Sequence, residues 1–246
     1  MENQSGCLKA DVIVLAAGSG NRMAAPVNKM FLEVNGIPIL YRTLYRFNSF
    51  ECINRILLVA KKEEIPKVKS MISRFKPLNK ISEIVKGGKE RSDSVRNGLI
   101  KSQEWRDTSI VMTHDGARPF VSEDIVKELI DNGQGDQIAI PVTKINETLR
   151  QKGENGLTRV IDRSVTFSVQ TPQVFDKKWI DECFVAKDNQ PQSFTDEASY
   201  FEVAGLPVKM IEGESWNIKI TNPDDIAWAE FLLQQHDELN LKGIET

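Results

Sequence analysis

The sequence has few of the residues that build disulfide and transition-metal sites. Its 246 residues include three cysteines and two histidines. Cys7, Cys52 and Cys183 lie far apart and form no CxxC pair, which predicts reduced, structural thiols. His114 and His236 are too few and too separated for a zinc site. These absences argue against a transition-metal enzyme and leave an oxygen-liganded Mg²⁺ open.

Long apolar runs and an excess of positive charge are also missing. No apolar run approaches the roughly 18 to 20 residues that span a bilayer, and the first nine residues lack the pattern of a signal or transit peptide. The formal net charge is -3 at pH 7, whereas nucleic-acid-binding domains usually carry a basic face. We therefore expect a cytoplasmic protein with no membrane partner and no nucleic-acid partner.

Short apolar segments alternate with amphipathic ones along most of the chain. Strands are predicted at residues 12–15, 56–59, 84–85, 110–112 and 138–140, with helices at 39–47 and 65–75 and from Ser92 and Ser122. Apolar strands that alternate with helices are typical of a parallel sheet covered on both faces. The expected fold class is α/β, a Rossmann-like three-layer sandwich with a mostly parallel sheet. We expect a single domain over residues 1–246.

This alternation stops at about residues 143–170. Two short segments there flank GENG at 153–156, which predicts a β-hairpin. The hairpin has few large apolar residues of its own, so we expect an arm that projects or packs on a partner chain. Beyond it, residues 217–221 are expected to form a short strand, and Pro223 is expected in the first turn of a closing helix.

Residues 16–29 read AAGSGNRMAAPVNK and follow the first predicted strand. Ala16, Ala17 and Gly18 let backbone amides approach phosphate oxygens closely. Arg22 and Lys29 supply two cations, which suit a triphosphate whose α-phosphorus gains negative charge during attack. A preorganised charge there is worth about 3 to 4 kcal/mol in the transition state. A tight strand-to-helix turn with solvated charges is the alternative interpretation.

The same segment departs from two familiar phosphate-binding patterns. Met23 stands where the dinucleotide fingerprint requires its third glycine, and no Gly-Lys-Ser/Thr follows as in a Walker A loop. A nicotinamide dehydrogenase is therefore disfavoured.

A second Gly-rich segment, GGKERSDSVRNGL at residues 87–99, follows the strand near Val85. Its glycine pair can lie against a flat ligand, and Ser94 near the helix start is expected to face outward. We place Gly88, Arg91 and Ser94 among the nucleotide-binding residues. The alternative is a glycine turn before a capped helix.

The segment THDGARP at residues 113–119 ends another predicted strand, where ligand sites gather in open α/β folds. Asp115 is the candidate Mg²⁺ ligand and, with Gly116, a nucleotide-binding candidate. Arg118 is expected to order this loop or to contact substrate phosphate, and His114 to be structural. An Asp–Arg pair that braces a turn is the alternative.

Together these motifs resemble the 2-C-methyl-D-erythritol 4-phosphate cytidylyltransferase family, within the nucleotidyltransferases that act on sugar phosphates. The resemblance rests on LAAGSGNRM, the lysine seven positions after its arginine, the two later segments, and the uncommon QTPQ at residues 170–173. It runs from about residue 11 to residue 233. It implies transfer of CMP from CTP to a polyol phosphate with Mg²⁺, and a homodimer formed through the hairpin.

The resemblance also assigns roles to individual residues. The implied catalytic residues are Arg22, Lys29, Arg163 and Lys219. The implied acceptor-binding residues are Arg118, Thr148, Arg163, Thr171 and Lys219. The sequence departs from the family where its usual Pro-Lys-Gln reads Asn28-Lys29-Met30 and its usual Asp-Thr reads Glu147-Thr148. A ribitol-5-phosphate cytidylyltransferase and a non-catalytic nucleotide-binding protein stay as alternatives.

Overall fold

The computed structural model describes residues 8–18, 28–153, 155–188 and 195–241. In these ranges eight strands form one sheet, in the order β12-β7-(β10, β11)-β6-β1-β4-β5, with β10 and β11 both beside β7. Its strands are β1 (Ala10–Leu15), β4 (Ile53–Ala60), β5 (Ile81–Lys86), β6 (Ile110–Asp115), β7 (Ile138–Lys144), β10 (Phe167–Val169), β11 (Gln173–Asp176) and β12 (Val208–Glu212).

Most neighbouring strands of the sheet run parallel. The pairs β1–β4, β1–β6, β4–β5 and β12–β7 are parallel, whereas β11 is antiparallel to both β6 and β7. The predicted mostly parallel α/β sheet is thus confirmed. The strands β10, β11 and β12 have no counterpart in the sequence prediction.

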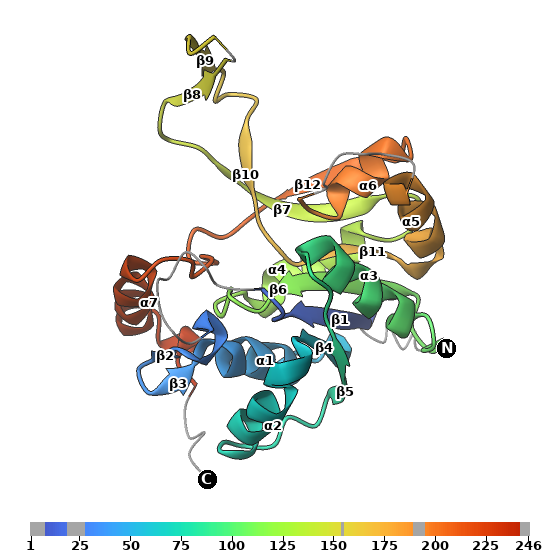
Figure 1. Ribbon diagram of the computed structural model, residues 1–246, viewed down its shortest axis with the longest axis vertical. Coiled ribbons are helices and arrows are strands. Elements are labelled where there is room, and N and C mark those ends of the chain that lie inside the picture. The colour runs from blue at the N-terminus through green and yellow to red at the C-terminus, as the bar shows by residue number, and fades with distance from the viewer. Residues whose placement is uncertain (1–7, 19–27, 154, 189–194, 242–246) are drawn as a thin grey trace, which may run out of the picture.

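Helices cover both faces of the sheet (Figure 1). Val12 and Val14 of β1 contribute to one apolar cluster, and Ile13 and Leu15 to the other, as expected for a strand buried on both faces. The first cluster includes α1 (Ile39–Ser49), α2 (Ile65–Ser73) and α4 (Glu123–Asn132); the second includes α3 (Arg91–Ser102), α5 (Ile180–Asp188) and α6 (Ala198–Val203). The three-layer prediction is confirmed.

A third apolar cluster attaches the closing helix α7 (Asp224–Gln235) to the body of the molecule. Ala229 and Leu233 of α7 lie in it with Val34 and Phe120. The remaining short elements are η2 (Lys29–Phe31), β2 (Glu33–Val34), β3 (Ile37–Pro38), η3 (Lys62–Glu64), η4 (Lys177–Trp179) and η5 (Asp237–Leu239). No helix in the described ranges is both long and apolar enough to cross a bilayer.

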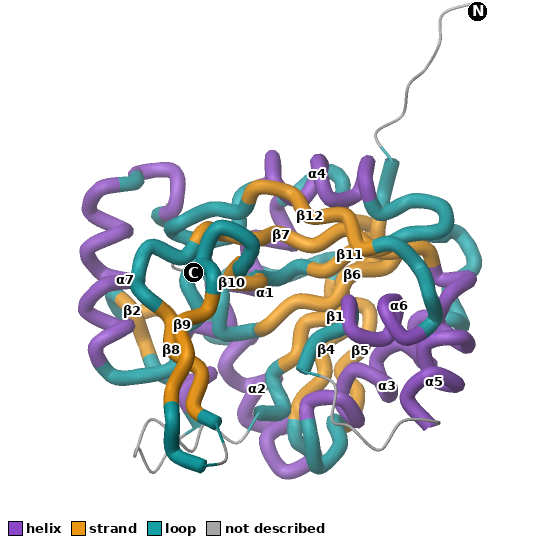
Figure 2. Tube along the Cα trace, turned by 90° about the horizontal axis from the view of Figure 1, so that it is seen from above, coloured by secondary structure: helices purple, strands orange, loops and turns teal. Residues whose placement is uncertain are grey.

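The hairpin projects from the sheet as an arm (Figures 1 and 2). Its strands β8 (Leu149–Lys152) and β9 (Thr158–Ile161) pair antiparallel, and Gly156 in the turn has a φ of +78°, which favours glycine. The predicted span of 143–170 is too long at both ends. Residues 143–144 belong to β7, and β10 pairs with β7 in the main sheet.

Two predictions near the C-terminus are wrong. Residues 217–221 form an extended connection and no strand; the amide of Ile220 donates one hydrogen bond to the carbonyl of Ala117 at 2.9 Å. Pro223 is the N-cap of α7 and precedes its first turn. The side chain of Asp225 instead receives hydrogen bonds from the amides of Thr221 and Asn222, which holds the connection against the helix start.

Candidate functional site

The carboxyl ends of β1, β4 and β6 meet at one edge of the sheet. In the parallel register Leu15 pairs with both Val59 and Asp115. The amide of Ala16 donates to the carbonyl of Val59 at 2.8 Å, and the amide of Gly116 donates to the carbonyl of Leu15 at 2.9 Å. The first Gly-rich segment and the segment around Asp115 are therefore neighbours, where ligand sites of open α/β sheets form.

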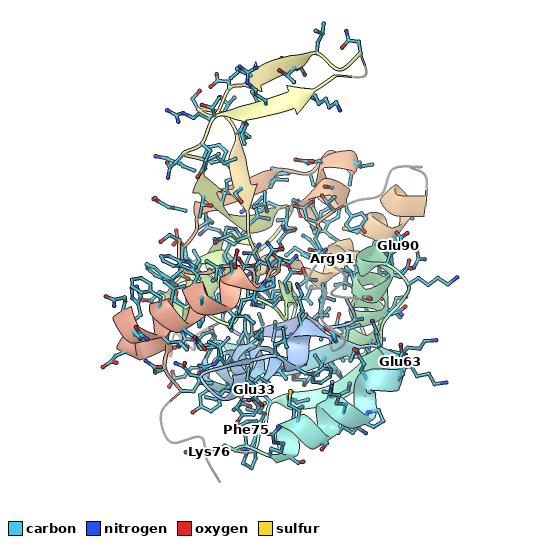
Figure 3. The ribbon with its side chains drawn as sticks, turned by 60° about the vertical axis from the view of Figure 1, so that its left-hand side comes forward. Glu33, Glu63, Phe75, Lys76, Glu90 and Arg91 are labelled. Atoms are coloured by element: carbon cyan, nitrogen blue, oxygen red, sulfur yellow. The ribbon has the colours of Figure 1, made fainter. Side chains whose placement is uncertain are left out.

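A cleft of about 400 Å³ opens at this edge. Its charged lining residues in the described part of the chain are Lys29, Lys89, Glu90, Arg91, Asp115 and Lys219. Its other lining residues are Leu15, Ala17, Gly18, Met30, Ser94, Ala117 and Thr221. Figure 3 shows Glu90 and Arg91 at the start of α3, which borders the cleft. Among these charged residues the cations outnumber the acids, and such a lining attracts a polyanion such as a nucleoside triphosphate.

Asp115 lies among three cations. Its Oδ2 is 2.7 Å from Lys219 Nζ and 3.8 Å from Arg118 Nε, and its Oδ1 is 3.3 Å from Arg91 Nε. Burial by itself would raise the pKa of this carboxyl, but the charges of Arg91 and Lys219 outweigh burial and lower it. Asp115 is therefore ionised at neutral pH, and it holds the two cleft cations Arg91 and Lys219 in place.

A buried carboxylate that sequence reasoning missed holds Arg91 from the other side. Glu197 is 1% exposed, and its two oxygens accept hydrogen bonds from Arg91 Nη1 at 2.9 Å and Nη2 at 3.3 Å. The Gln173 side chain accepts from the Glu197 amide at 2.9 Å and fixes this turn. Residues 195–199, TDEAS, have the sequence of a helix start with a cap. Asp196 does accept hydrogen bonds from Ser199, as a cap would, but the sequence carried no signal for the ion pair.

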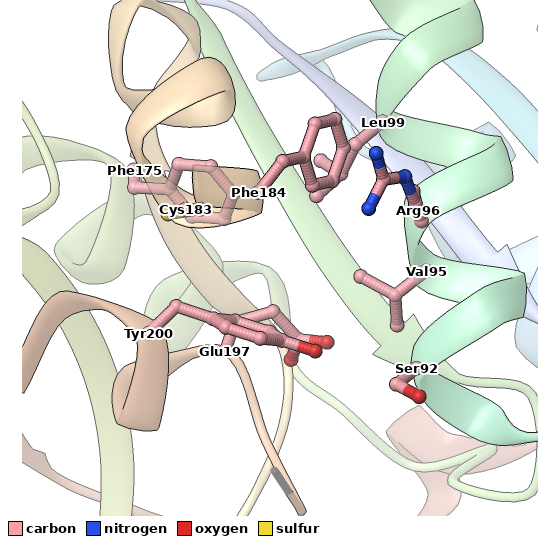
Figure 4. Close-up of a pocket in the computed structure, with 9 residues that line it drawn as sticks. All are labelled: Ser92, Val95, Arg96, Leu99, Phe175, Cys183, Phe184, Glu197 and Tyr200. Carbon is pink, nitrogen blue, oxygen red and sulfur yellow. The ribbon is translucent and has the colours of Figure 1, made fainter. Parts of the chain in front are cut away.

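Glu197 and Tyr200 extend toward α3, which carries Ser92, Val95 and Arg96 (Figure 4). The crevice that they line has a volume of about 10 Å³, which is enough for one water molecule. It is too small for a substrate, so the cleft beside Asp115 is the candidate site.

Lys29 is placed at the cleft by its neighbours. It is 8% exposed, and its Nζ donates to the carbonyl of Ile220 at 2.9 Å. Arg22, the second predicted cation of this segment, lies outside the described residues. Of the three small residues predicted to contact nucleotide, Ala17 and Gly18 line the cleft, and Ala16 is buried behind it.

The second Gly-rich segment forms the cleft wall differently from the prediction. Ser94 lines the cleft but is 3% exposed, and its hydroxyl accepts from the Gly88 amide at 3.1 Å and donates to the Glu90 carbonyl at 3.2 Å. The prediction of an outward-facing hydroxyl is wrong, because the loop at residues 88–90 folds over the Ser94 hydroxyl and hydrogen-bonds it. A Cβ added at Gly87 would lie 2.3 Å from Ala17 Cβ, so glycine is required where the two loops meet.

Three predicted residues lie beside Asp115 without lining the cleft. Thr171 is 5% exposed and its hydroxyl accepts from the Asp115 amide at 3.1 Å. Arg118 donates to the Asn217 carbonyl at 2.8 Å and so orders the connection that carries Lys219. Gly116 is in the turn after β6, and Ala117 takes its place in the lining.

His114 is buried behind Asp115, in agreement with a structural role. Its Nε2 is 3.0 Å from the Arg118 carbonyl, so this nitrogen carries the proton, and its Nδ1 accepts from the Thr171 hydroxyl at 3.2 Å. Burial lowers the pKa of His114 to about 4, which keeps the ring neutral.

Thr148 and Arg163 are not brought to the cleft of their own chain. Both are exposed on the arm, and Arg163 donates a hydrogen bond to the carbonyl of Asn146. Neither lines the cleft. Their predicted contact with the acceptor stays a prediction.

The described side chains do not form a site suited to a divalent cation. They contain no group of three or more His, Cys, Asp and Glu residues that could hold one. Both oxygens of Asp115 lie against cations, and a metal there would have to displace Arg91 or Lys219. The role of Asp115 as a Mg²⁺ ligand stays a prediction, and these ion pairs disfavour it.

Comparisons with known proteins show the family to which the chain belongs. The family model for 2-C-methyl-D-erythritol 4-phosphate cytidylyltransferase matches residues 10–235. The 2-C-methyl-D-erythritol 4-phosphate cytidylyltransferase of Geobacillus kaustophilus is 40% identical over 91% of this chain and 96% of its own length.

Solved structures of this kind share the fold. The 4-diphosphocytidyl-2C-methyl-D-erythritol synthase of Anaerococcus prevotii superposes with a TM-score of 0.78 at 30% identity, covering 92% of this chain and 96% of that one. The cytidylyltransferase of Thermus thermophilus gives a TM-score of 0.73 at 28% identity, covering 92% and 100%. With a family match over most of its length and a cationic cleft at the expected sheet edge, the chain belongs to the 2-C-methyl-D-erythritol 4-phosphate cytidylyltransferase family of nucleotidyltransferase enzymes.

Proposed function

We propose that this cytidylyltransferase joins CMP from CTP to 2-C-methyl-D-erythritol 4-phosphate in the cleft beside Asp115, as a step of isoprenoid precursor synthesis by the non-mevalonate route. The observation that carries the assignment of the site is the line Glu197–Arg91–Asp115–Lys219, which spans the cleft with alternating charge. It presents fixed cations to a polyanionic substrate, and fixed charges stabilise a transition state without reorganisation.

The nucleotide half of the site is formed by the two Gly-rich segments. The residues proposed to form the CTP site are Arg22, Lys29, Ala16, Ala17, Gly18, Gly88, Arg91, Ser94, Asp115 and Gly116, of which Ala16 and Gly116 stand behind the lining. Support comes from Lys29, Ala17 and Gly18 at one wall of the cleft and Arg91 and Ser94 at the other. The triphosphate lies between these walls, with Lys29 at the α-phosphorus.

The reaction is an in-line displacement. An oxygen of the acceptor phosphate forms a bond to the α-phosphorus, the bond from that phosphorus to the β-bridging oxygen breaks, and pyrophosphate leaves with the electron pair. A phosphate monoester is largely dianionic at pH 7, since its second pKa is about 6, so the attacking oxygen needs no general base. This fits a cleft in which positioning and charge carry the chemistry.

The acceptor half combines residues of the cleft and of the arm. Lys219 lines the cleft, and Arg118 and Thr171 stand directly behind it. Thr148 and Arg163 reach an acceptor only if the arm of a second copy lies over this cleft. The exposed apolar side chains of the arm, Leu157, Val160 and Val165, favour such a homodimer.

The metal, domain and cell-compartment assignments complete the proposal. A divalent cation is part of the proposal, with Asp115 as the residue that would hold it if its ion pairs with Arg91 and Lys219 opened. When bound, the ion would neutralise triphosphate charge. We treat residues 1–246 as one domain with an arm, acting in the cytoplasm.

The direct test is to incubate the protein with CTP, Mg²⁺ and either 2-C-methyl-D-erythritol 4-phosphate or ribitol 5-phosphate, and to follow pyrophosphate release. Release with the first acceptor, and much slower release with the second, is expected. The reverse preference would assign the chain to ribitol phosphate. CTP binding without pyrophosphate release from either acceptor would leave a non-catalytic nucleotide-binding protein.

A further inference from the structure

The side chain of Asn28 joins three separate parts of the chain beside the cleft. Its Nδ2 is 2.8 and 3.0 Å from the two carboxylate oxygens of Glu64, and 3.3 Å from the carbonyl oxygen of Gly18. Its Oδ1 accepts from the amide of Met30 at 3.2 Å. One side chain thus touches both ends of the segment between β1 and η2 and an acid from elsewhere in the fold.

The direction of the Asn28 amide is fixed by these partners. Glu64 and the Gly18 carbonyl are acceptors, so they require the NH₂ group, while the Met30 amide is a donor and requires the oxygen. The opposite orientation would place the amide oxygen against a carboxylate. Both Asn28 and Glu64 are half-buried, which strengthens a hydrogen bond to a charged acceptor.

Glu64 is a rigid anchor for this contact. It ends η3, which follows β4 after one residue, and the Glu64 amide donates to the carbonyl of Lys61 at 2.9 Å. Strand β4, which pairs with β1 and β5, therefore sets the position of η3 and of the Glu64 carboxylate. The hydrogen bonds from Asn28 to Glu64 hold the backbone next to Lys29, whose Nζ reaches the cleft.

We propose that Asn28 and Glu64 are a positioning pair that sets Lys29 and the Gly18 backbone against the triphosphate. This inference rests on the proposed function, since it assigns Lys29 to the α-phosphorus. Neither member of the pair lines the cleft, so neither is a catalytic residue. Their contribution is geometric, and a displacement of about 1 Å at a reacting group costs on the order of 10²-fold in rate.

A charge-reversal series tests the pair. Asn28→Asp places two carboxylates within hydrogen-bond distance, so they repel and the pair opens. We expect kcat to fall by about 10²-fold, with a smaller rise in the KM for CTP. Glu64→Gln alone keeps an acceptor for the Asn28 amide, and we expect kcat within about threefold of the parent.

The double variant is the decisive member of the series. Asn28→Asp with Glu64→Gln restores an amide-to-carboxylate hydrogen bond with the polarity reversed, so we expect kcat to recover at least about tenfold over Asn28→Asp. The exposed neighbour Glu63 provides the matched control, because it has no bond to Asn28. Asn28→Asp combined with Glu63→Gln should show no recovery. Melting temperatures of all variants report the folded state separately.

Two results would overturn the pairing. Either Asn28→Asp turns over like the parent, or Glu64→Gln brings no more recovery than Glu63→Gln does. Failure of the proposed function is distinguishable, because it appears as absent pyrophosphate release in the parent protein. In that event CTP affinity measured by calorimetry across the same series still tests the pair, with weakened binding expected in Asn28→Asp and recovery in the double variant.

Discussion

Lys219 Nζ lies 2.7 Å from Asp115 Oδ2, which joins the connection before α7 to the carboxyl end of β6. In the proposed reaction, an incoming acceptor phosphate would compete with Asp115 for Lys219. The ion pair already orients this lysine, so we expect little loss of side-chain entropy on binding.

Replacing Lys29 should mainly slow the chemical step. Lys29→Ala removes the charge assigned to the α-phosphorus, and we expect kcat to fall by at least about 10²-fold, as for the loss of one oxyanion-stabilising group. Steady-state pyrophosphate release at saturating CTP measures it. Lys69→Ala, on the exposed side of α2, is the control and should leave kcat unchanged. Unchanged turnover in Lys29→Ala would remove this lysine from the mechanism.

Removing the carboxylate of Glu197 should weaken nucleotide binding. Glu197→Ala leaves Arg91 without its bidentate partner, so the guanidinium swings toward Asp115 and we expect the KM for CTP to rise by about tenfold. Loss of these charge-assisted hydrogen bonds should also lower the free energy of unfolding by about 2 kcal/mol, since the Arg91 side chain is 31% exposed. Denaturant titration and CTP kinetics measure the two effects. Glu202→Gln, exposed on the same helix, should change neither quantity.

Burial of neutral His114 should make stability depend on pH. The unfolded chain binds a proton at this histidine below about pH 6.5, whereas the folded protein binds it only near pH 4. The free energy of unfolding should therefore fall as the pH drops from 6.5 to 4, by at most roughly 3 kcal/mol. The contribution is fully present above pH 6.5. Denaturant titration of the parent and of His114→Gln at pH 7.5 and pH 5 isolates the contribution of His114. An equal change in the free energy of unfolding in both proteins would contradict this prediction.

The arm should complete the acceptor site of a second copy. Lys29→Ala has an intact arm and a defective cleft, and Arg163→Ala has the converse. Each variant alone should be nearly inactive. A mixture should regain up to about one quarter of the parent activity, because half of randomly formed dimers contain one intact combination of cleft and arm. Mixing must follow dissociation of the dimers.

The same arm prediction has an assembly control. Val160→Asp places a charge on the exposed apolar side of the arm, and light scattering at micromolar concentration should then report a monomer. A parent protein that is itself monomeric, or a mixture without recovered activity, would contradict completion of the site in trans.

The sequence predicted the sheet well because its strands are continuous apolar runs. Val12 and Ile13 occupy a strand buried on both faces, and such strands leave a local signal. The position of Asp115 beside Leu15 followed from the same logic, since parallel strands end at one edge. Lys29 and Lys219 both line the cleft, and their catalytic roles stay predictions.

What could not be predicted depends on contacts between distant segments. Nothing near Glu197 in the sequence marks Arg91 as its partner, because the pair forms only when α6 packs beside α3. The extended form of residues 217–221 likewise reflects hydrogen bonds from Arg118 and to Ala117 that replace a strand partner. Local propensity carries no information about such contacts.

The segment that returns from the arm to the sheet, β10 and the residues after it, connects the arm with the cleft. β10 ends at Val169, whose carbonyl is 3.5 Å from Arg118 Nη2, and two residues later Thr171 holds the Asp115 amide. Only Gln170 separates the end of β10 from the residue whose hydroxyl accepts from the Asp115 amide. We expect a partner that holds the arm to restrain this returning segment as well, and with it the backbone at Asp115.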